Sequence, residues 1–282
     1  MRIRFIVATR HDENAFFTRS LLAQSLGVLG HGLPLILEPV FQSSAGLAAV
    51  YNPAIERSEP DDLLVFVHDD VHVDDWHLGL RLREGLAAFD VIGIAGALER
   101  KPGQTAWWGM ETGGKLIAAE PGAQSGSIKH VKQGRRQTAG RFIESGLAAL
   151  PLGRRAWRKH WLTHQDGSYS PIAPPRKGEA APSSRHVGSG AGKLDIFGPV
   201  PAPVELLDGV FIGARARSLK PSPVRFDPRF RYHFYDLDFC RQCAAAGLTM
   251  GTWPIAISHA SYGSWGDGWR KARNLYLDKW RD

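Results

Sequence analysis

The chain has 282 residues, of which 43% are hydrophobic and 22% are charged, and it carries a formal net charge of +7. This composition is ordinary for a globular protein with a substantial core. Two cysteines, Cys240 and Cys243, exclude a disulfide scaffold, and no apolar run approaches the roughly 18–20 residues of a membrane span. The first apolar run is too short for a signal peptide, so we expect a cytoplasmic protein. The positive charge favours an anionic partner, and on charge alone a nucleotide-sugar, a nucleic acid, an acidic glycan or a lipid headgroup would fit.

Strands and helices alternate along the first hundred residues. Short apolar runs predict strands, and apolar residues at helical spacing predict helices. The predicted strands cover residues 3–8, 34–40, 63–67 and 90–97, and the predicted helices cover residues 15–26, 46–57 and 77–89. This alternation indicates an α/β, Rossmann-like fold with a mostly parallel central sheet flanked by helices.

The pattern changes over residues 101–203, which are rich in Gly, Pro, Ser and Arg and carry much of the positive charge. We predict a long irregular basic insertion here, within a single domain that spans residues 1–282. Two short helices are expected inside it, near residues 142–150 and 154–162. No recognisable nucleic-acid-binding motif accompanies the charge, so we do not expect a nucleic-acid partner.

Regular structure is predicted again after the insertion. Two strands are expected, over residues 204–215, with a turn inside, and over residues 249–257. A helix over residues 239–246 has Asp238 in its N-terminal turn and is ended by Gly247. A basic, aromatic helix over residues 269–280 closes the chain. It could lie peripherally on a membrane surface, but docking on its own domain is the favoured role.

A cluster of polar residues, His68, Asp69 and Asp70, follows the predicted strand at residues 63–67 directly. In open α/β sheets, ligands bind outside the carboxyl ends of the strands. Carboxylates select hard divalent cations such as Mg²⁺ or Mn²⁺, and a nearby histidine favours Mn²⁺ or a later transition metal. The alternative is an ordinary solvated acidic turn. Asp236 and His259, which also lie at element ends, strengthen the metal-site interpretation.

These segments together resemble a known family, the family 2-type glycosyltransferases of GT-A fold, in particular the bacterial group that includes the StrF-like domains. The resemblance covers residues 3–100 and 204–265 and is absent from the insertion. The motifs that carry it are YNPAI (51–55), FVHDDV (66–71), LLDGVFIGAR (206–215), FDPRF (226–230), HFYDLDFCRQCAAAGL (233–248) and ISHASYG (257–263).

The resemblance implies a metal site for Mn²⁺ or Mg²⁺ that neutralises the diphosphate of a nucleotide-sugar. Asp70 matches the metal-binding position of the family's acidic motif, and Asp69 is expected near the ribose or sugar. The first position of that motif is His68 here instead of Asp. His259 matches a late histidine that approaches the metal. His72 is a further candidate, for which a structural role is favoured.

Asp236 matches the aspartate that deprotonates the acceptor hydroxyl in this family. Attack opposite the diphosphate would then invert the anomeric carbon without a covalent enzyme intermediate. The Glu that usually precedes this aspartate is Tyr235 here. The alternative role for Asp236 is that of a helix cap.

Other site residues are expected from their positions. Nucleotide contacts are assigned to Thr9, Arg10 and Asn52. Asp208 and Gly209 match a segment on the acceptor side, where glycine allows close backbone approach.

Aromatic and thiol side chains complete the candidates. The flat rings of Trp107 and Trp108 could stack on an acceptor sugar, or they could simply belong to the core. Cys240 and Cys243 form a lone Cys-x-x-Cys pair, for which helix packing is favoured over a zinc site.

The leading hypothesis is therefore a metal-dependent, inverting transfer of a sugar from a nucleotide-diphosphate donor, expected to be UDP-linked, to a glycan or small-molecule acceptor. A sugar-phosphate nucleotidyltransferase is the first alternative, although the loop at residues 9–13 lacks the glycine such enzymes use. A non-catalytic glycan-binding protein with the same fold is the second.

Overall fold

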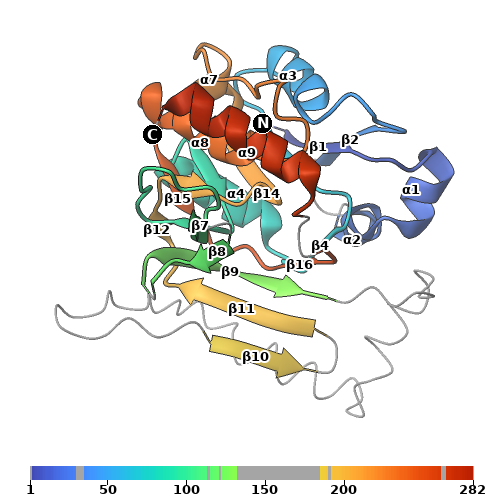
Figure 1. The fold of residues 1–282 in the computed structure, drawn as a ribbon. Coiled ribbons are helices and arrows are strands. Elements are labelled where there is room, and N and C mark those ends of the chain that lie inside the picture. Colours follow the sequence, from blue (N-terminus) through green and yellow to red (C-terminus); the bar gives the residue numbers. More distant parts are fainter. Residues whose placement is uncertain are drawn as a thin grey trace. The chain divides into compact units, whose positions relative to one another are not determined.

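The computed structural model describes residues 2–29, 35–112, 115–120, 122–131, 185–189, 192–261 and 265–281. Residues 1–132 and 181–282 form one compact unit, to which the following description refers (Figure 1). The two helices expected near residues 142–150 and 154–162 lie outside the described residues.

A seven-stranded mixed sheet forms the centre of this unit, in the order β12-β15-β5-β14-β3-β1-β2. The strands are β1 (Ile3–Ala8), β2 (Leu35–Val40), β3 (Leu63–Val67), β5 (Val91–Gly93), β12 (Ala202–Pro203), β14 (Phe211–Arg215) and β15 (Met250–Thr252). Strand β1 is parallel to β2 and β3, and β5 is parallel to β15, whereas β14 is antiparallel to both β3 and β5. The expected α/β class is confirmed, and the sheet is mixed.

The middle of the sheet is its most apolar part. All five residues of β3 are buried, and β3 is paired on both sides, with Ile3 opposite Leu63 on β1 and Phe211 opposite Val67 on β14. Continuous apolar strands suit a position covered on both faces. The loop that follows β3 is therefore held at a fixed place.

Helices accompany the strands. They are α1 (Glu13–Arg19), α2 (Leu21–Leu29), α3 (Ala48–Glu56), α4 (Leu78–Ala88), α7 (Ala216–Leu219), α8 (Tyr235–Ala245) and α9 (Asp267–Trp280). The single helix expected over residues 15–26 is instead two, because Ser20 is extended between them. The Ser20 hydroxyl donates to the Asp69 carbonyl at 2.8 Å and accepts from the Ala23 backbone at 3.2 Å, so this break fastens α2 to the loop after β3.

A second sheet has the order β10-β11-β9-β16-β4, with β6 pairing β9 and β13. Its strands are β4 (Val71–Val73), β6 (Ala95–Ala97), β9 (Gln124–His130), β10 (Arg185–Ser189), β11 (Gly192–Gly198), β13 (Leu206–Leu207) and β16 (Ile257–His259). The strands expected over residues 90–97 and 249–257 are each divided between the two sheets, as β5 and β6 and as β15 and β16.

Irregular structure was expected throughout residues 101–203, and this is wrong for both ends of the segment. Strands β9, β10 and β11 belong to the second sheet, and β7 (Gly109–Thr112) pairs with β8 (Lys115–Ala118) in a hairpin. Polar and glycine-rich strands such as β9 (QSGSIKH) escape an apolar-run criterion because their pairing partners supply the stability.

Helix α9 docks on its own domain, as favoured from the sequence, and runs beside α8 (Figure 1). Asp238 on α8 is fully buried. It accepts from Lys279 Nζ at 2.6 Å and from Trp280 Nε1 at 2.9 Å. Asp238 lies in the first turn of α8, as expected. Its carboxylate also binds two residues of α9 and so anchors that helix.

Among the described residues, none of the helices is both long and apolar enough to cross a membrane.

Candidate functional site

The candidate site lies at the point where the strand order of the central sheet reverses. The chain places β2 on one side of β1 and β3 on the other, and ligands of open α/β sheets bind at the carboxyl ends of the strands beside such a point. Thr9 follows β1 and Asp69 follows β3, and the Thr9 hydroxyl donates to Asp69 Oδ2 at 2.5 Å. The two loops expected to contact a donor are therefore joined directly.

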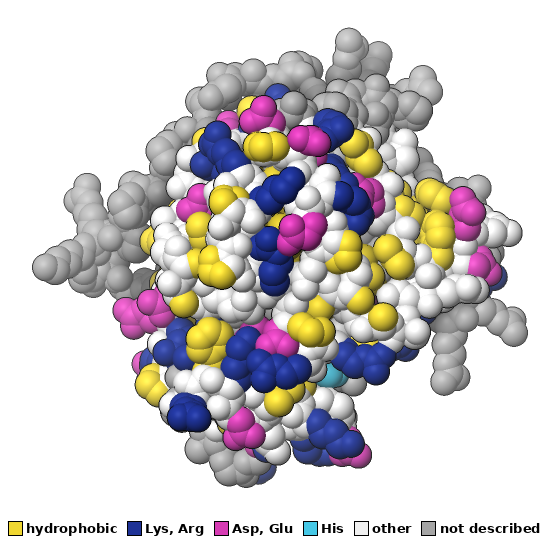
Figure 2. All heavy atoms as spheres, turned by 90° about the horizontal axis from the view of Figure 1, so that it is seen from above, with side chains coloured by type: hydrophobic (Ala, Val, Ile, Leu, Met, Phe, Trp, Pro, Cys, Tyr) yellow, Lys and Arg dark blue, Asp and Glu magenta, His cyan; other side chains and the backbone are white. Residues whose placement is uncertain are grey.

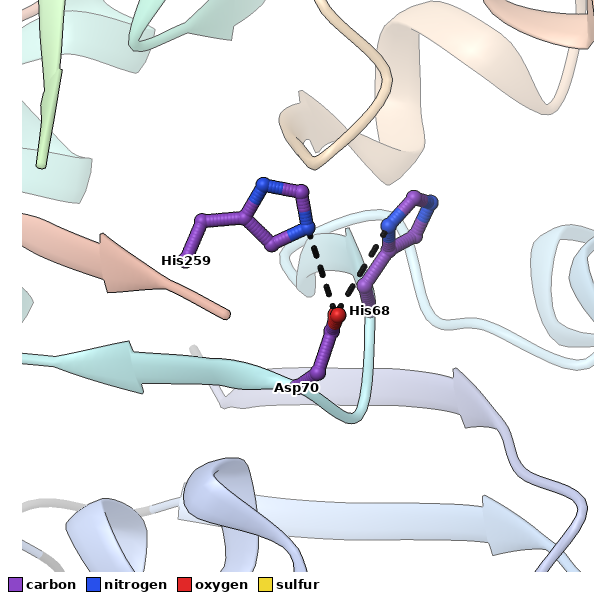
Figure 3. Close-up of side chains that lie close together, drawn as sticks. All are labelled: His68, Asp70 and His259. Atoms are coloured by element: carbon purple, nitrogen blue, oxygen red, sulfur yellow. Dashed lines mark ion pairs between the residues drawn. The ribbon is translucent and has the colours of Figure 1, made fainter. Parts of the chain in front are cut away.

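His68, Asp70 and His259 converge beside this point (Figure 3). The Asp70 Oδ1 atom is 3.3 Å from His259 Nε2 and 4.0 Å from His68 Nδ1. One ligand atom from each residue lies within 4.8 Å of the others. Donor atoms bound to one ion at 2.0–2.2 Å are about 3–4 Å apart, so small side-chain movements would close this set around a cation. This is a candidate metal site, and the set of two imidazoles and one carboxylate suits Mn²⁺ or a later transition metal better than Mg²⁺.

The second sheet brings the distant histidine to the site. Strand β16 is antiparallel to β4, with His259 opposite Val71, and the Ala260 backbone donates to the Asp70 carbonyl at 3.1 Å. Backbone pairing thus determines the separation of two side chains that are far apart in the sequence.

Tyr235 orients the first residue of the set. Its hydroxyl donates to the Gly209 carbonyl at 2.9 Å and lies 2.8 Å from His68 Nε2. Since the hydroxyl proton is used by Gly209, the tyrosine oxygen accepts the Nε2 proton of His68. The Nδ1 lone pair of His68 then faces Asp70, which is the arrangement that a metal-binding histidine needs. Tyr235 therefore positions His68.

The charge states of Asp70 and His68 fit a cation. Burial opposes ionisation of Asp70, but the hydrogen bond and charge of His259 hold the pKa of Asp70 well below its usual range. Burial lowers the pKa of His68, so His68 is neutral and able to coordinate. Burial would also lower the pKa of His259, but its hydrogen bond to Asp70 raises it. The site therefore holds a carboxylate ready to bind a metal.

The candidate base, Asp236, lies in the first turn of α8. Its Oδ2 accepts from the Gly209 backbone at 3.0 Å. Burial, together with the nearby charge of Asp208, raises its pKa to about 7. A pKa near neutrality is what a general base requires, and it arises although the helix N-terminus favours the charged form.

Two features of the backbone hold Asp236 in place. The preceding cap residue, Phe234, has a left-handed conformation, with φ of 63°, which is strained for a bulky residue. At Gly209, an added Cβ would overlap the Tyr235 hydroxyl and lie 2.8 Å from Cβ of Asp236. The packing of Tyr235 and Asp236 therefore requires glycine at this position, and its expected place on the acceptor side stays a prediction. Asp208 turns its carboxylate toward its own loop, where Oδ1 accepts from the Val210 backbone at 3.0 Å.

Asn52 and Arg10, which were both expected to contact the nucleotide, lie in different surroundings. Both polar atoms of the Asn52 amide pair with the backbone of Phe226, each at 2.8 Å, so Asn52 clamps α3 to a distant loop. Arg10 instead lines a cavity of about 810 Å³, which we name the basic cavity. This size is typical of small-molecule sites. Because Arg10 follows Thr9, the basic cavity begins at the carboxyl end of β1.

The basic cavity contains residues that sequence analysis did not select. Its basic lining residues are Arg10, Arg229, Arg231, His233 and Lys271, and none of the described lining residues is a carboxylate. The basic and aromatic run Arg229–Tyr235 was the available signal, but only the fold brings it opposite Arg10. On the face shown in Figure 2, Lys and Arg side chains are interleaved with Asp, Glu and hydrophobic side chains.

The two tryptophans considered for acceptor stacking have separate positions. Trp107 is buried, with its ring perpendicular to Phe197 at 4.8 Å between centroids, so it belongs to the core. Trp108 lines a second cavity, of about 410 Å³. The stacking role therefore remains a prediction for Trp108 alone.

The contacts of three remaining candidates, His72, Cys240 and Cys243, suit a structural role. His72 pairs with Asp74 at 2.8 Å, outside the candidate metal set, which agrees with the structural role favoured for it. Cys240 and Cys243 are both buried, and the Leu207 backbone donates to Cys240 Sγ at 3.2 Å. Helix packing, as favoured, accounts for this pair.

Comparison of the sequence with models of known protein families and with curated proteins found no match.

Proposed function

We propose that this chain is a metal-dependent, inverting glycosyltransferase of the GT-A, family 2 type, which uses a nucleotide-diphosphate sugar as donor. The observation that carries the proposal is that the basic cavity begins at Arg10, next to Thr9, and that Thr9 is hydrogen-bonded to Asp69, which lies between His68 and Asp70 of the candidate metal set. A cation and a cationic cavity linked in this way suit a ligand with a diphosphate next to a larger organic group.

We assign separate roles to the candidate metal set and to the basic cavity. His68, Asp70 and His259 would hold Mn²⁺ or Mg²⁺, which when bound neutralises charge on the leaving diphosphate. Arg10, Arg231 and Lys271 would hold the nucleotide phosphates. A UDP-sugar is the expected donor, but a cationic cavity by itself recognises the phosphates and not the base.

In the proposed transfer step, Asp236 accepts the proton of the acceptor hydroxyl. The acceptor hydroxyl gives its proton to the Asp236 carboxylate while its oxygen attacks the anomeric carbon from the side opposite the diphosphate. The new C–O bond forms as the bond to the diphosphate oxygen breaks, and the nucleoside diphosphate leaves. The anomeric configuration is inverted, and no covalent enzyme intermediate forms.

The test is calorimetric titration of UDP in the presence of Mn²⁺, Mg²⁺ or a chelator, followed by a screen of UDP-sugars for release of UDP. We expect binding with Mn²⁺ and little with the chelator. Asp70→Asn should lose the metal-dependent part of binding, and Asp61→Asn, the same change at an exposed site, should keep it. Absence of metal-dependent UDP binding, or formation of pyrophosphate from UTP and a sugar phosphate, would overturn the proposal.

A further inference from the structure

The second cavity, of about 410 Å³, lies beside the first turns of α9. We name it the aromatic cavity, and its lining residues are Trp108, Glu111, Leu116, Trp265, Trp269, Arg270 and Arg273. Residues 268, 271, 272 and 275 of α9 line the basic cavity, whereas residues 269, 270 and 273 line the aromatic cavity. Because helical residues three or four apart share a face, the two cavities lie on different faces of one helix.

The tryptophans form the walls of this cavity, and among them Trp265 is exposed whereas Trp269 is buried. Trp265 is perpendicular to Trp108, at 5.8 Å and 85°, and strongly inclined to Trp269, at 5.4 Å and 70°. Parallel stacking would have covered the rings with one another. Trp265 keeps 44% of its surface exposed. The electron-rich face of an indole attracts the polarised C–H bonds on the apolar side of a sugar ring.

One of the two arginines of the aromatic cavity, Arg270, has a solvent-exposed ion pair that a ligand carboxylate could replace. Two arginines line it against one glutamate, and Glu111 is already paired with Arg273. The Arg270 partner is Asp267, an exposed residue that is not among the cavity's lining residues. A planar guanidinium beside an aromatic wall suits a carboxylate.

The aromatic cavity is coupled to the candidate base through packing. Trp269 contacts Phe234, with ring centroids 5.3 Å apart, and Phe234 is the cap residue of the helix that carries Asp236. The cavity wall therefore contacts the start of the helix that carries Asp236.

We propose that the aromatic cavity binds a uronic acid ring of the acceptor, with the sugar's apolar face on Trp265 and its carboxylate toward Arg270. Its role as an acceptor site rests on the proposed glycosyl transfer. The binding itself does not, because it requires neither donor nor metal.

The experiment is saturation-transfer NMR of the full chain, with methyl β-D-glucuronide and methyl β-D-glucoside as probes. These probes differ only at C6, which is a carboxylate in the glucuronide and a hydroxymethyl group in the glucoside. We expect the glucuronide to bind about fivefold or more tightly than the glucoside, and Arg270→Gln to remove that preference. Trp265→Ala should weaken binding of both by about fivefold. Trp76→Ala, which removes another exposed tryptophan, should change neither.

Several outcomes would overturn the inference: no saturable binding of the glucuronide by the wild-type chain, equal binding of the two probes, or unchanged binding by Trp265→Ala. UDP titration with Mn²⁺ on the same samples separates the two proposals. Metal-dependent UDP binding without glucuronide binding rejects the aromatic cavity alone, and the reverse result rejects the donor site alone.

Discussion

Asp236 has an environment that raises the free energy of its charged form, and this is the form a general base needs. Its pKa is raised to about 7 by burial and by the charge of Asp208. Asp236→Asn keeps the size of the side chain and removes its basicity. We expect transfer to fall by about 100-fold to 10,000-fold, with metal-dependent UDP binding unchanged by calorimetry. Transfer near the wild-type rate would contradict the assignment of the base.

The same pKa predicts opposite pH dependences for activity and stability. Activity should rise with pH through about 7, because only ionised Asp236 accepts a proton. Since the folded pKa lies above the usual 3.8, the stabilisation associated with protonated Asp236 is complete below about pH 4 and is lost as pH rises through 7. Asp236→Asn should therefore unfold at a higher temperature than wild type at pH 8 and at a similar temperature at pH 4, as measured by calorimetry. A lower unfolding temperature for the variant at pH 8 would contradict this.

Tyr235 acts on the candidate metal site through one hydroxyl group. Tyr235→Phe leaves the ring in place but removes the acceptor for the His68 Nε2 proton. We expect Mn²⁺ affinity to fall by about tenfold or more, the usual cost of losing a partner of a metal-binding histidine. Competition with a fluorescent chelator measures it.

Tyr51 provides a matched control for this change. Its hydroxyl is buried and has no hydrogen-bond partner among the described residues, and its ring lies 6.4 Å from that of Tyr235. Tyr51→Phe should leave Mn²⁺ affinity unchanged. Equal losses for both variants would show that the effect comes from repacking of the aromatic cluster.

At the scale of elements, α9 is held to α8 by a buried ion pair. Lys279 contacts Asp238 at 2.6 Å and Asp227 at 2.9 Å. Lys279→Met would leave the buried Asp238 carboxylate without its cation, so we expect the free energy of unfolding to fall by about 2–3 kcal/mol in urea titrations. Lys271→Met, the same substitution at an exposed position of α9, should change it by less than about 0.5 kcal/mol.

The pairing of β4 with β16 explains why the second sheet matters to the site. Three register pairs place His259 beside Asp70, and β16 is paired on its other side with β9. The site is therefore supported by a strand from the segment expected to be irregular. The charge-rich stretch that resembled an insertion contributes part of the framework of the candidate metal site.

At the scale of the whole molecule, positive charge at the basic cavity should make nucleotide binding depend on salt. Raising sodium chloride from about 50 to about 500 mM should weaken UDP binding roughly fivefold to tenfold, because the salt screens its phosphates from the arginines and Lys271. Uridine, which lacks phosphates, serves as the control, and its binding affinity should fall much less. Equal salt dependence for the two ligands in calorimetric titrations would show that the cationic lining does not contact the phosphates.

The sequence alone determined the strands at residues 3–8 and 63–67, the α/β class, and the polar cluster after β3. These features are local, because an apolar run reports its own burial and the residues that follow it. It also selected Asp70, Asp236 and His259 through their resemblance to a family. Only the tertiary structure decided that His259 lies 3.3 Å from Asp70, that Tyr235 orients His68, that Asp238 anchors α9, and that arginines from the Arg229–Tyr235 run line a cavity with Arg10. The physical reason is that hydrophobic periodicity shows which faces are buried, but not which buried elements pair across nearly two hundred residues of chain.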